Sequence, residues 1–155
     1  MCGISPDIVT HVLNINPKVV PVRQKRRSLG PERSVALKEE CDKLLANGFI
    51  RESFYPKWIS NPVLVTKPNG KWRTCIDFSN LNDACPKDCF PLPRIDQLVD
   101  ATAGHELLSF MDAYSGYNQI AMHGPDQEST SFITDLGLYC YRVMPFGLKN
   151  AGATY

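Results

Sequence analysis

The sequence predicts an α+β fold in which antiparallel hairpins pack with helices. Turn-forming residues at 68–71 and 135–138 each follow a short apolar run, and this pattern favours two hairpins. Between residues 31 and 47, apolar residues recur at the spacing of one helical face: Leu37, Cys41, Leu44 and Leu45. The chain has 155 residues, enough for one domain with its own core.

The first 30 residues have no sustained hydrophobic period and are expected to form an extended, basic lead-in. Within them, residues 19–22 favour either a short strand or a polyproline stretch. A helix is expected to begin at Pro31, a residue favoured in the first turn, and to stop at Gly48. Residues 63–65 are then expected to form a strand that reverses at Asn69-Gly70 and returns along residues 72–78.

A proline-rich loop, residues 86–93, is expected to lead into a second helix that ends at Gly104. Its inward face is expected to contain three apolar residues: Ile95, Leu98 and Val99. Residues 107–111 form an apolar run of strand type that ends at Asp112. Residues 130–134 and 139–143 flank the second hairpin turn, and a helix-like turn is expected to begin at Gly147.

Basic residues are concentrated between residues 18 and 33. This stretch contains six lysines and arginines and a single acidic residue, Glu32, which gives a local charge of +5 in a chain whose net charge is +1. Composition leaves two interpretations open: a solvated basic loop, or a surface that meets a polyanion. We call residues 18–33 the basic segment.

Six cysteines stand at positions 2, 41, 75, 85, 89 and 140. The opening residues show no secretory signal pattern, and no run approaches the roughly 20 apolar residues of a membrane span. We therefore expect an intracellular, reducing compartment with free thiols and no membrane partner. Cys85 and Cys89 lack a second Cys/His pair at finger-like spacing, which favours packing and loop thiols over a zinc site.

Asp112 closes the apolar run, a position where an aspartate is ordinarily a turn former or a helix cap. Its context, DAYSGYNQI over residues 112–120, resembles the first palm motif of reverse transcriptases from gypsy-type LTR retrotransposons. In that family a strand-end aspartate binds both catalytic metals, and an aromatic residue five positions later lies beneath the incoming sugar. The resemblance implies that Asp112 is the catalytic metal ligand, that Ala113 lies beside the nucleotide, and that Tyr117 is the aromatic gate.

The chemistry of phosphoryl transfer agrees with these residue types. Two Mg²⁺ ions roughly 4 Å apart need hard oxygen ligands on a rigid support, and a carboxylate at a strand end supplies them. Mn²⁺ is the alternative ion. A flat ring at Tyr117 would clash with a 2′-hydroxyl and so select deoxynucleotides. Without the flanking motif, Tyr117 would be interpreted as a buried packing residue.

Three blocks, at residues 60–67, 69–73 and 76–82, resemble the fingers hairpin of the same family. In that hairpin a lysine and an arginine grip the triphosphate, and the corresponding residues here are Lys67 and Arg73. Arginine offers paired donors to phosphate oxygens and lysine a point charge, on a flap that can close over the nucleotide. The alternative is that both are ordinary strand and turn cations.

Two further blocks extend the resemblance. FPLPRID, residues 90–96, is typical of the junction between fingers and palm, where Arg94 is either a template-phosphate contact or a solvated or ion-paired arginine. YRVMPFGLKNA, residues 141–151, resembles the second palm motif, which implies that Phe146 and Gly147 lie against the nascent base pair and Lys149 near the template or primer. Phe146 stands where retroviral enzymes usually carry glutamine, which favours stacking over a polar contact.

The resemblance covers residues 21–155 and implies the fingers, about 31–93, and the start of the palm, 94–155, of a right-hand polymerase. The chain is expected to be truncated before the family's Tyr-x-Asp-Asp hairpin, since it contains no adjacent Asp-Asp pair. The apolar strand ending at Asp112 is then expected to keep an unpaired edge. The implied function is an RNA-directed DNA polymerase segment of a retrotransposon polyprotein, inactive as this chain alone. The alternatives are a non-catalytic nucleic-acid-binding remnant and an inert fragment.

The implied partners are an RNA or DNA template with its primer, deoxynucleoside triphosphates, and the rest of the pol polyprotein with its thumb, RNase H and integrase. The same resemblance implies a cytoplasmic location, with virus-like particles and a nuclear stage as further sites.

Overall fold

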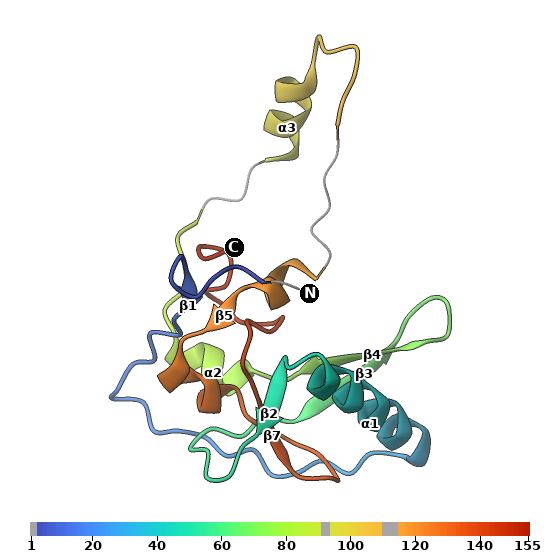
Figure 1. The fold of residues 1–155 in the computed structure, drawn as a ribbon, viewed down its shortest axis with the longest axis vertical. Helices are drawn as coiled ribbons and strands as arrows, with labels where there is room; N and C mark the ends of the chain where they lie inside the picture. The colour runs from blue at the N-terminus through green and yellow to red at the C-terminus, as the bar shows by residue number, and fades with distance from the viewer. Residues whose placement is uncertain (1–2, 91–93, 110–114) are drawn as a thin grey trace.

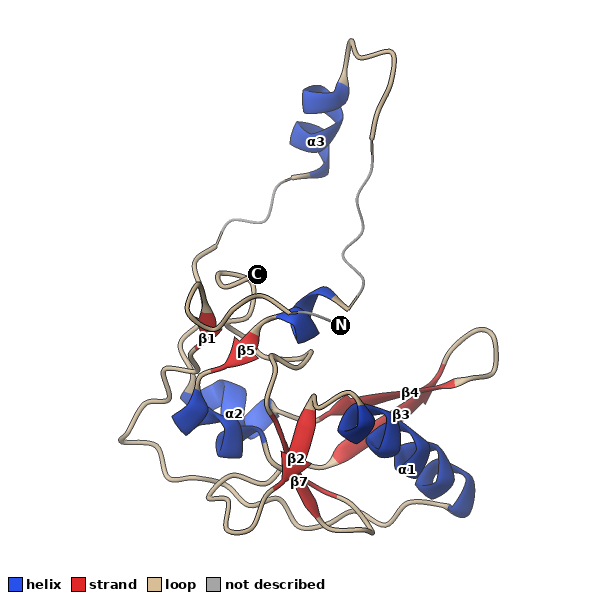
Figure 2. Ribbon diagram, in the orientation of Figure 1, coloured by secondary structure: helices blue, strands red, loops and turns tan. Residues whose placement is uncertain are grey.

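The computed structural model describes residues 3–90, 94–109 and 115–155. In this part of the chain three small sheets and three α-helices are arranged as an α+β fold (Figures 1 and 2). The predicted fold class is confirmed. The core is formed by residues from all three sheets, helices α1 and α2, the N-terminal arm and the connecting segments. Its largest fully buried side chains include Phe78, Phe132, Leu13, Leu81 and Met144.

Helix α1, Pro31–Ala46, begins at the predicted proline and is followed by Gly48 with a φ of +70°. Leu37 and Cys41 are buried, and Leu44 packs against the core. The prediction for Leu45 was wrong, because its side chain is 37% exposed. Successive helical residues are about 100° apart, so the neighbour of Leu44 turns away from the core side.

The first predicted hairpin is present as β3, Pro62–Thr66, and β4, Trp72–Ile76, with Thr66 opposite Trp72 next to the turn. The turn is closed by the Gly70 amide, which donates to the Lys67 carbonyl at 2.9 Å, and by the Lys67 amide, which donates to the Lys71 carbonyl. Of the Asn-Gly pair, only Gly70 has a positive φ, +75°. The reversal is therefore a turn followed by a glycine bulge rather than the predicted two-residue turn.

The second hairpin is β6, Phe132–Ile133, with β7, Leu138–Tyr141, and β2, Ile50–Glu52, pairs antiparallel with the other side of β7. Sequence analysis missed β2 because three residues are too few to show a period. Helix α1 contacts β2, β3 and β4, so the helix joins the fingers hairpin to this sheet. The pairing of β2 with β7 continues by one hydrogen bond, in which the Arg142 amide donates to the Phe49 carbonyl at 2.8 Å.

The N-terminal arm, residues 3–15, was expected to be part of an extended lead-in; it contains a turn at residues 6–8 followed by a short strand, and it is packed into the protein. Strand β1, Thr10–His11, pairs parallel with β5, Ala121–Met122, and the side chains of His11 and Leu13 are fully buried. The Leu13 amide donates to the Asp126 carboxylate at 2.9 Å. Asp126 belongs to a 3-10 helix, Gly124–Thr130, that the sequence analysis missed. The arm is thus a part of the core.

Helix α2, Ser79–Ala84, was also missed, because residues 76–82 were interpreted only through their resemblance to the fingers hairpin. Helix α3, Ile95–Thr102, is present as predicted, and Gly104 follows it with a φ of +82°. Its apolar side chains were expected to point inward, and that prediction was wrong: Ile95 is 78% exposed, Leu98 52% and Val99 60%. Figure 1 shows α3 standing clear of the three sheets, so no described element covers this face.

The strand predicted at residues 107–111 is absent at residues 107–109, and residues 110 and 111 lie outside the described part. Leu107 is 91% exposed, and none of the described strands pairs with this run. A strand needs a hydrogen-bonded neighbour, and an unpaired edge had been expected here. The helix-like segment from Gly147 onward consists of turns rather than a helix.

Candidate nucleotide site

A pocket of about 270 Å³ lies between the β3–β4 hairpin with α1 on one side and, on the other, the segment before β5 together with the segment after β7. One wall consists of hairpin and α1 residues, and the other of residues from the two stretches that resemble palm motifs. The lining residues that the following argument uses are Glu40, Lys67, Arg73, Cys75, Ser115, Asn118 and Phe146.

The hairpin wall brings together the two predicted phosphate-binding cations. Lys67 and Arg73 are both exposed, and within residues 3–90, 94–109 and 115–155 neither forms an ion pair. Arg73 lies opposite Val65 across the hairpin, and the Lys67 backbone is fixed by the turn. Two positive side chains that form no ion pair in the described part of the chain are therefore presented to one pocket, an arrangement suited to an anionic ligand.

The opposite wall contains Ser115, Asn118, Pro145 and Phe146. Ser115 has a left-handed backbone, with φ 49° and ψ 43°, a conformation that costs a non-glycine residue free energy and is concentrated at functional sites. The 3-10 helix Gly116–Gln119 follows directly and carries Asn118 into the lining. Sequence analysis missed Ser115 and Asn118, since neither residue type signals nucleotide chemistry by itself.

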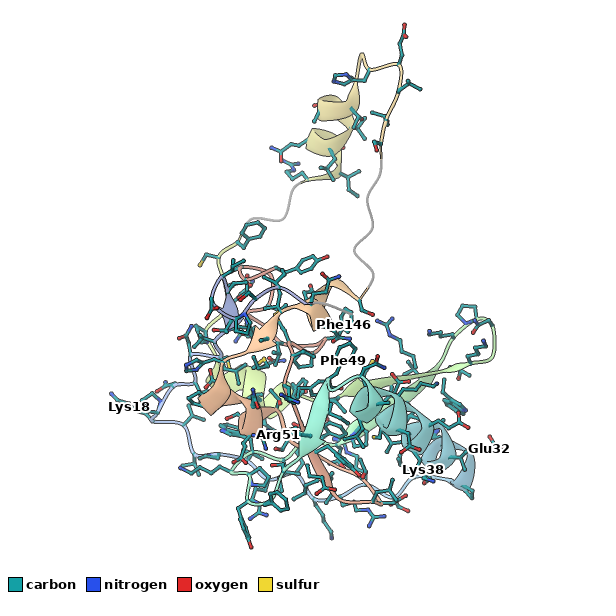
Figure 3. The ribbon with its side chains drawn as sticks, in the orientation of Figure 1. Lys18, Glu32, Lys38, Phe49, Arg51 and Phe146 are labelled. Carbon is teal, nitrogen blue, oxygen red and sulfur yellow. The ribbon has the colours of Figure 1, made fainter. Side chains whose placement is uncertain are left out.

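Tyr117 lies behind Phe146. The two ring centroids are 4.7 Å apart with an interplanar angle of 82°, and Tyr155 approaches the other side of Tyr117 at 4.7 Å. A Cβ on Gly116 would come within 2.5 Å of the Tyr155 hydroxyl oxygen, so a larger residue at that position would displace the Tyr155 side chain. Among the described residues, the pocket lining includes Phe146, which is 52% exposed (Figure 3), but not Tyr117.

Gly147 and Lys149 lie against α2 rather than in the pocket. Gly147 has a φ of +95°, and its carbonyl accepts a hydrogen bond from the Asn82 side chain at 2.8 Å. The Lys149 ammonium donates to the carbonyls of Asn82, at 3.3 Å, and Cys85, at 3.4 Å. A cation at the carboxyl end of a helix is stabilised there by the helix dipole. This position gives Lys149 a structural partner.

Arg94 directly precedes α3, and its backbone amide donates to the Gln97 side chain at 3.3 Å. Arg94 does not line the pocket. Asp112 and Ala113, the predicted catalytic ligand and its neighbour, lie outside the described residues. The structure thus brings Lys67, Arg73 and Phe146 together in one pocket and leaves Arg94 apart from it.

The basic segment is tied to the fold by two of its arginines. Arg27 forms an ion pair with Asp77 at 2.9 Å, and Arg26 forms one with Asp135. The Ser79 hydroxyl, which donates to the Asp77 carboxylate, and the Arg27 guanidinium lower the pKa of Asp77. These pairs neutralise part of the local charge. The basic segment is therefore neither a fully solvated loop nor a fully free polyanion-binding surface.

The family model "Reverse transcriptase (RNA-dependent DNA polymerase)" matches residues 65–155, which include every pocket-lining residue among the described ones except Glu40 and Leu44 of α1. The chain belongs to the reverse transcriptase family. The reverse transcriptase chain is 31% identical over 151 residues to the retrovirus-related Pol polyprotein from transposon 297 of Drosophila melanogaster, a match that covers 95% of the chain and 14% of that polyprotein. It is 40% identical over 83 residues to an RNA-directed DNA polymerase homolog of Oenothera berteroana, covering 54% of the chain and 58% of that relative. The chain thus spans less than two thirds of the length of either relative.

Solved structures give the same fold. The native protease–reverse transcriptase of prototype foamy virus has a TM-score of 0.78 to this reverse transcriptase chain at 19% identity, covering 92% of the chain and 19% of the viral protein. A foamy viral protease–reverse transcriptase in complex with double-stranded DNA has a TM-score of 0.71 at 18% identity, covering 93% of the chain and 24% of that protein. This likeness confirms the predicted architecture, a partial reverse transcriptase domain.

The described part of the reverse transcriptase chain does not by itself form a metal centre. No three His, Cys, Asp or Glu side chains gather there at a spacing that could hold an ion. The carboxylate of Asp112 has the hard oxygen chemistry that Mg²⁺ prefers, but it needs further ligands. In the same described part, no helix combines the length and the apolar character that crossing a bilayer requires.

Proposed function

We propose that this chain is the fingers, about residues 31–93, and the first part of the palm, residues 94–155, of an RNA-directed DNA polymerase from a gypsy-type LTR retrotransposon. In the complete enzyme it adds deoxynucleotides to a primer on an RNA or DNA template by two-metal phosphoryl transfer. The observation that carries this proposal is the pocket in which the unpaired Lys67 and Arg73 face Ser115, Asn118 and Phe146.

Each lining residue has a role that follows from its chemistry. Lys67 and Arg73 bind the triphosphate, and Arg73 offers two parallel donors where Lys67 offers a point charge. Phe146 stacks against the incoming base or sugar, and Gly147, held by Asn82, fixes the turn that presents it. Tyr117 supports Phe146 and excludes the 2′-hydroxyl, and Ala113 lies beside the nucleotide.

Asp112 is the metal ligand and catalytic residue in this proposal, with its further partners supplied from outside the described residues. When bound, two Mg²⁺ ions, or Mn²⁺ in their place, neutralise the charge that develops on the phosphoryl oxygens. Arg94 is exposed and available to template phosphates, whereas Lys149 would have to release its carbonyl partners to reach the template or primer.

The gypsy-type assignment is supported by relatives described as transposon polyproteins, such as transposon 412 of Drosophila melanogaster, 41% identical over 81 residues. That match covers 52% of the chain and 6% of the polyprotein. Phe146 in place of the retroviral glutamine supports the same assignment. The partners we propose are a primed template, deoxynucleoside triphosphates and the remaining polyprotein, in the cytoplasm or virus-like particles with a nuclear stage.

The test is primer extension by a longer version of the chain that continues into a Tyr-x-Asp-Asp segment. We expect Mg²⁺-dependent synthesis that Asp112→Asn abolishes while primer–template binding is nearly unchanged. Residues 1–155 alone are expected to show no incorporation. Synthesis that survives Asp112→Asn would contradict the proposal. The rival function, a non-catalytic nucleic-acid-binding remnant, predicts salt-sensitive binding with no synthesis by either protein.

A further inference from the structure

Glu40 is the only acidic side chain that lines the pocket among the described residues. It lies on α1, on the side of the helix that contacts β4, and is half-buried. It also borders a second hollow of about 390 Å³ beside Lys43, Lys71 and Trp72, so it stands in the wall between the two. No ion pair joins Glu40 to Lys67 or Arg73 in the part of the chain that the structure describes.

A carboxylate in a pocket built for polyphosphate works against the binding of any anion. The repulsion between this carboxylate and the ligand grows in proportion to the negative charge of the ligand, and so does the attraction between the ligand and the two cations. A deoxynucleoside triphosphate carries about four negative charges when free and about two when it is bound to Mg²⁺, so a carboxylate penalises the free form about twice as strongly in free energy. The penalty is partly screened, because the pocket is open to water.

We propose that Glu40 is a specificity-determining residue that reduces the electrostatic preference of the pocket for a metal-free triphosphate over a metal-neutralised one. This inference rests on the proposed function, since it assigns a property to the same nucleotide site. Glu40 does not touch the reacting atoms. Counted over the described lining residues, Lys67, Arg73 and Glu40 give a net charge of one positive unit. Lys67 and Arg73 alone would give two.

The neighbouring residue offers a matched control. Glu39 lies on the same helix, is exposed, and borders the second hollow without lining the pocket. Glu39→Gln and Glu40→Gln remove the same charge from adjacent helical positions. Only the second changes the lining of the nucleotide pocket.

Cys75 provides a readout that needs no catalysis. Its thiol is exposed and lines the pocket, whereas the buried Cys41 and Cys85 have pKa values raised by burial to about 11, so at neutral pH they react slowly with thiol reagents. Peptide mass spectrometry separates Cys75 from the exposed Cys89. A ligand in the pocket slows the alkylation of Cys75, and titrating that protection gives an apparent Kd.

The experiment titrates dATP against the 155-residue chain, once with Mg²⁺ and once with a chelator, and normalises each variant to its ligand-free rate. We expect Glu40→Gln to tighten the Mg²⁺ complex about threefold and metal-free dATP about ninefold, the square of the first factor, for a single charge removed at roughly 10 Å. Glu39→Gln is expected to change the apparent Kd of both dATP forms by much less. Far-UV circular dichroism checks that both variants are folded.

Three results would overturn the inference while leaving the proposed function standing. Glu40→Gln could change the apparent Kd values no more than Glu39→Gln does. It could change the Kd of metal-bound and metal-free dATP by the same factor, or it could weaken dATP binding in a folded protein. A wild-type chain whose Cys75 is protected by neither form of dATP would overturn the proposed nucleotide site itself, and the inference with it.

Discussion

Phe146 and Tyr117 pack edge to face, with their ring planes inclined at 82°. Phe146 faces the pocket and Tyr117 supports it from behind, with Tyr155 on the far side. Edge-to-face pairs contribute about 0.5–1.5 kcal/mol beyond their buried area. Any movement of Tyr117 is therefore transmitted to the ring that a nucleotide would meet.

Replacing Tyr117 tests the sugar-gate role. In the longer, polymerising protein, Tyr117→Val is expected to raise incorporation of ribonucleotides relative to deoxynucleotides at least tenfold, because the smaller side chain leaves space for a 2′-hydroxyl. Tyr117→Phe keeps the ring and should leave this ratio unchanged. The measurement is competitive single-nucleotide extension, and a ratio that does not move in Tyr117→Val would refute the gate.

Arg73→Gln and Lys67→Gln test the triphosphate-binding cations. Each is expected to weaken the dATP protection of Cys75 by roughly tenfold or more, since a charge-assisted hydrogen bond to phosphate contributes about 1.5–3 kcal/mol. Lys71→Gln is the matched control, because Lys71 belongs to the same hairpin but borders only the second hollow. Equal losses in all three variants would indicate a general charge effect rather than a binding site.

Local turn chemistry made the hairpins predictable, whereas burial by distant parts of the chain did not. Pro68, Asn69 and Gly70 predict a reversal without any knowledge of the rest of the fold, and Gly70 takes the positive φ that this reversal needs. The partners of Lys67 and Arg73 across the pocket could be inferred only from the family resemblance. The resemblance did not point to Ser115, Asn118 or Glu40, which lie in the lining through the geometry of α1 and of the 3-10 helix Gly116–Gln119.

The least predictable features involve the N-terminal arm and α3. Leu13 and Ile15 alternate with Asn14 and Asn16 over too few residues to predict a buried strand, so the full burial of Leu13 depends on tertiary contacts that sequence patterns do not record. The opposite error was made for Ile95, whose helical spacing implied a buried face that no described element covers. Amphipathic spacing identifies a face that is suited to packing, but it does not identify what packs there.

Asn61 is expected to be a main determinant of stability. Its side chain is 1% exposed, donates to the Gln24 side chain and the Lys25 carbonyl, and accepts from the Arg27 amide at 2.9 Å. Asn61→Ala removes these three part-buried hydrogen bonds, so we expect a loss of roughly 2–4 kcal/mol in the free energy of unfolding. Urea denaturation measures it.

Asn69→Ala is the corresponding control. Asn69 is exposed and accepts one hydrogen bond from the Lys71 amide at 3.2 Å, so its loss is expected to stay below about 1 kcal/mol. If Asn61→Ala were as mild as Asn69→Ala, the link between the basic segment and the hairpin would contribute little to stability.

The pH dependence of stability tests the environment of His11. Burial lowers the pKa of His11 from 6.5, and it outweighs the opposing effects of Asn150, Asp126 and Asp88. Below about pH 6.5 the unfolded chain takes up a proton at His11 that the folded chain resists. The contribution of the neutral His11 to the free energy of unfolding is therefore complete above that pH and is lost as the pH falls toward the folded pKa.

The measurement is Tm between pH 7.5 and 5 for the wild type and His11→Gln, which does not titrate. We expect the wild-type Tm to fall more steeply over this range, whatever the absolute Tm of the variant. Parallel curves would show that His11 is not held neutral in the fold. Thr154→Ala, which removes the hydroxyl 2.8 Å from His11 Nδ1, should alter the level of the curve more than its slope.

The N-terminal arm is held by contacts with segments distant in sequence, through β5, Asp126 and the Asn150 side chain, which donates to the Leu13 carbonyl at 3.0 Å. Residues 16–23, by contrast, are all exposed. A single protease cut in that stretch would therefore leave a short peptide docked in the larger fragment. Covalent continuity and structural integrity are separable here, and the chain could be rebuilt from two synthetic pieces mixed in solution.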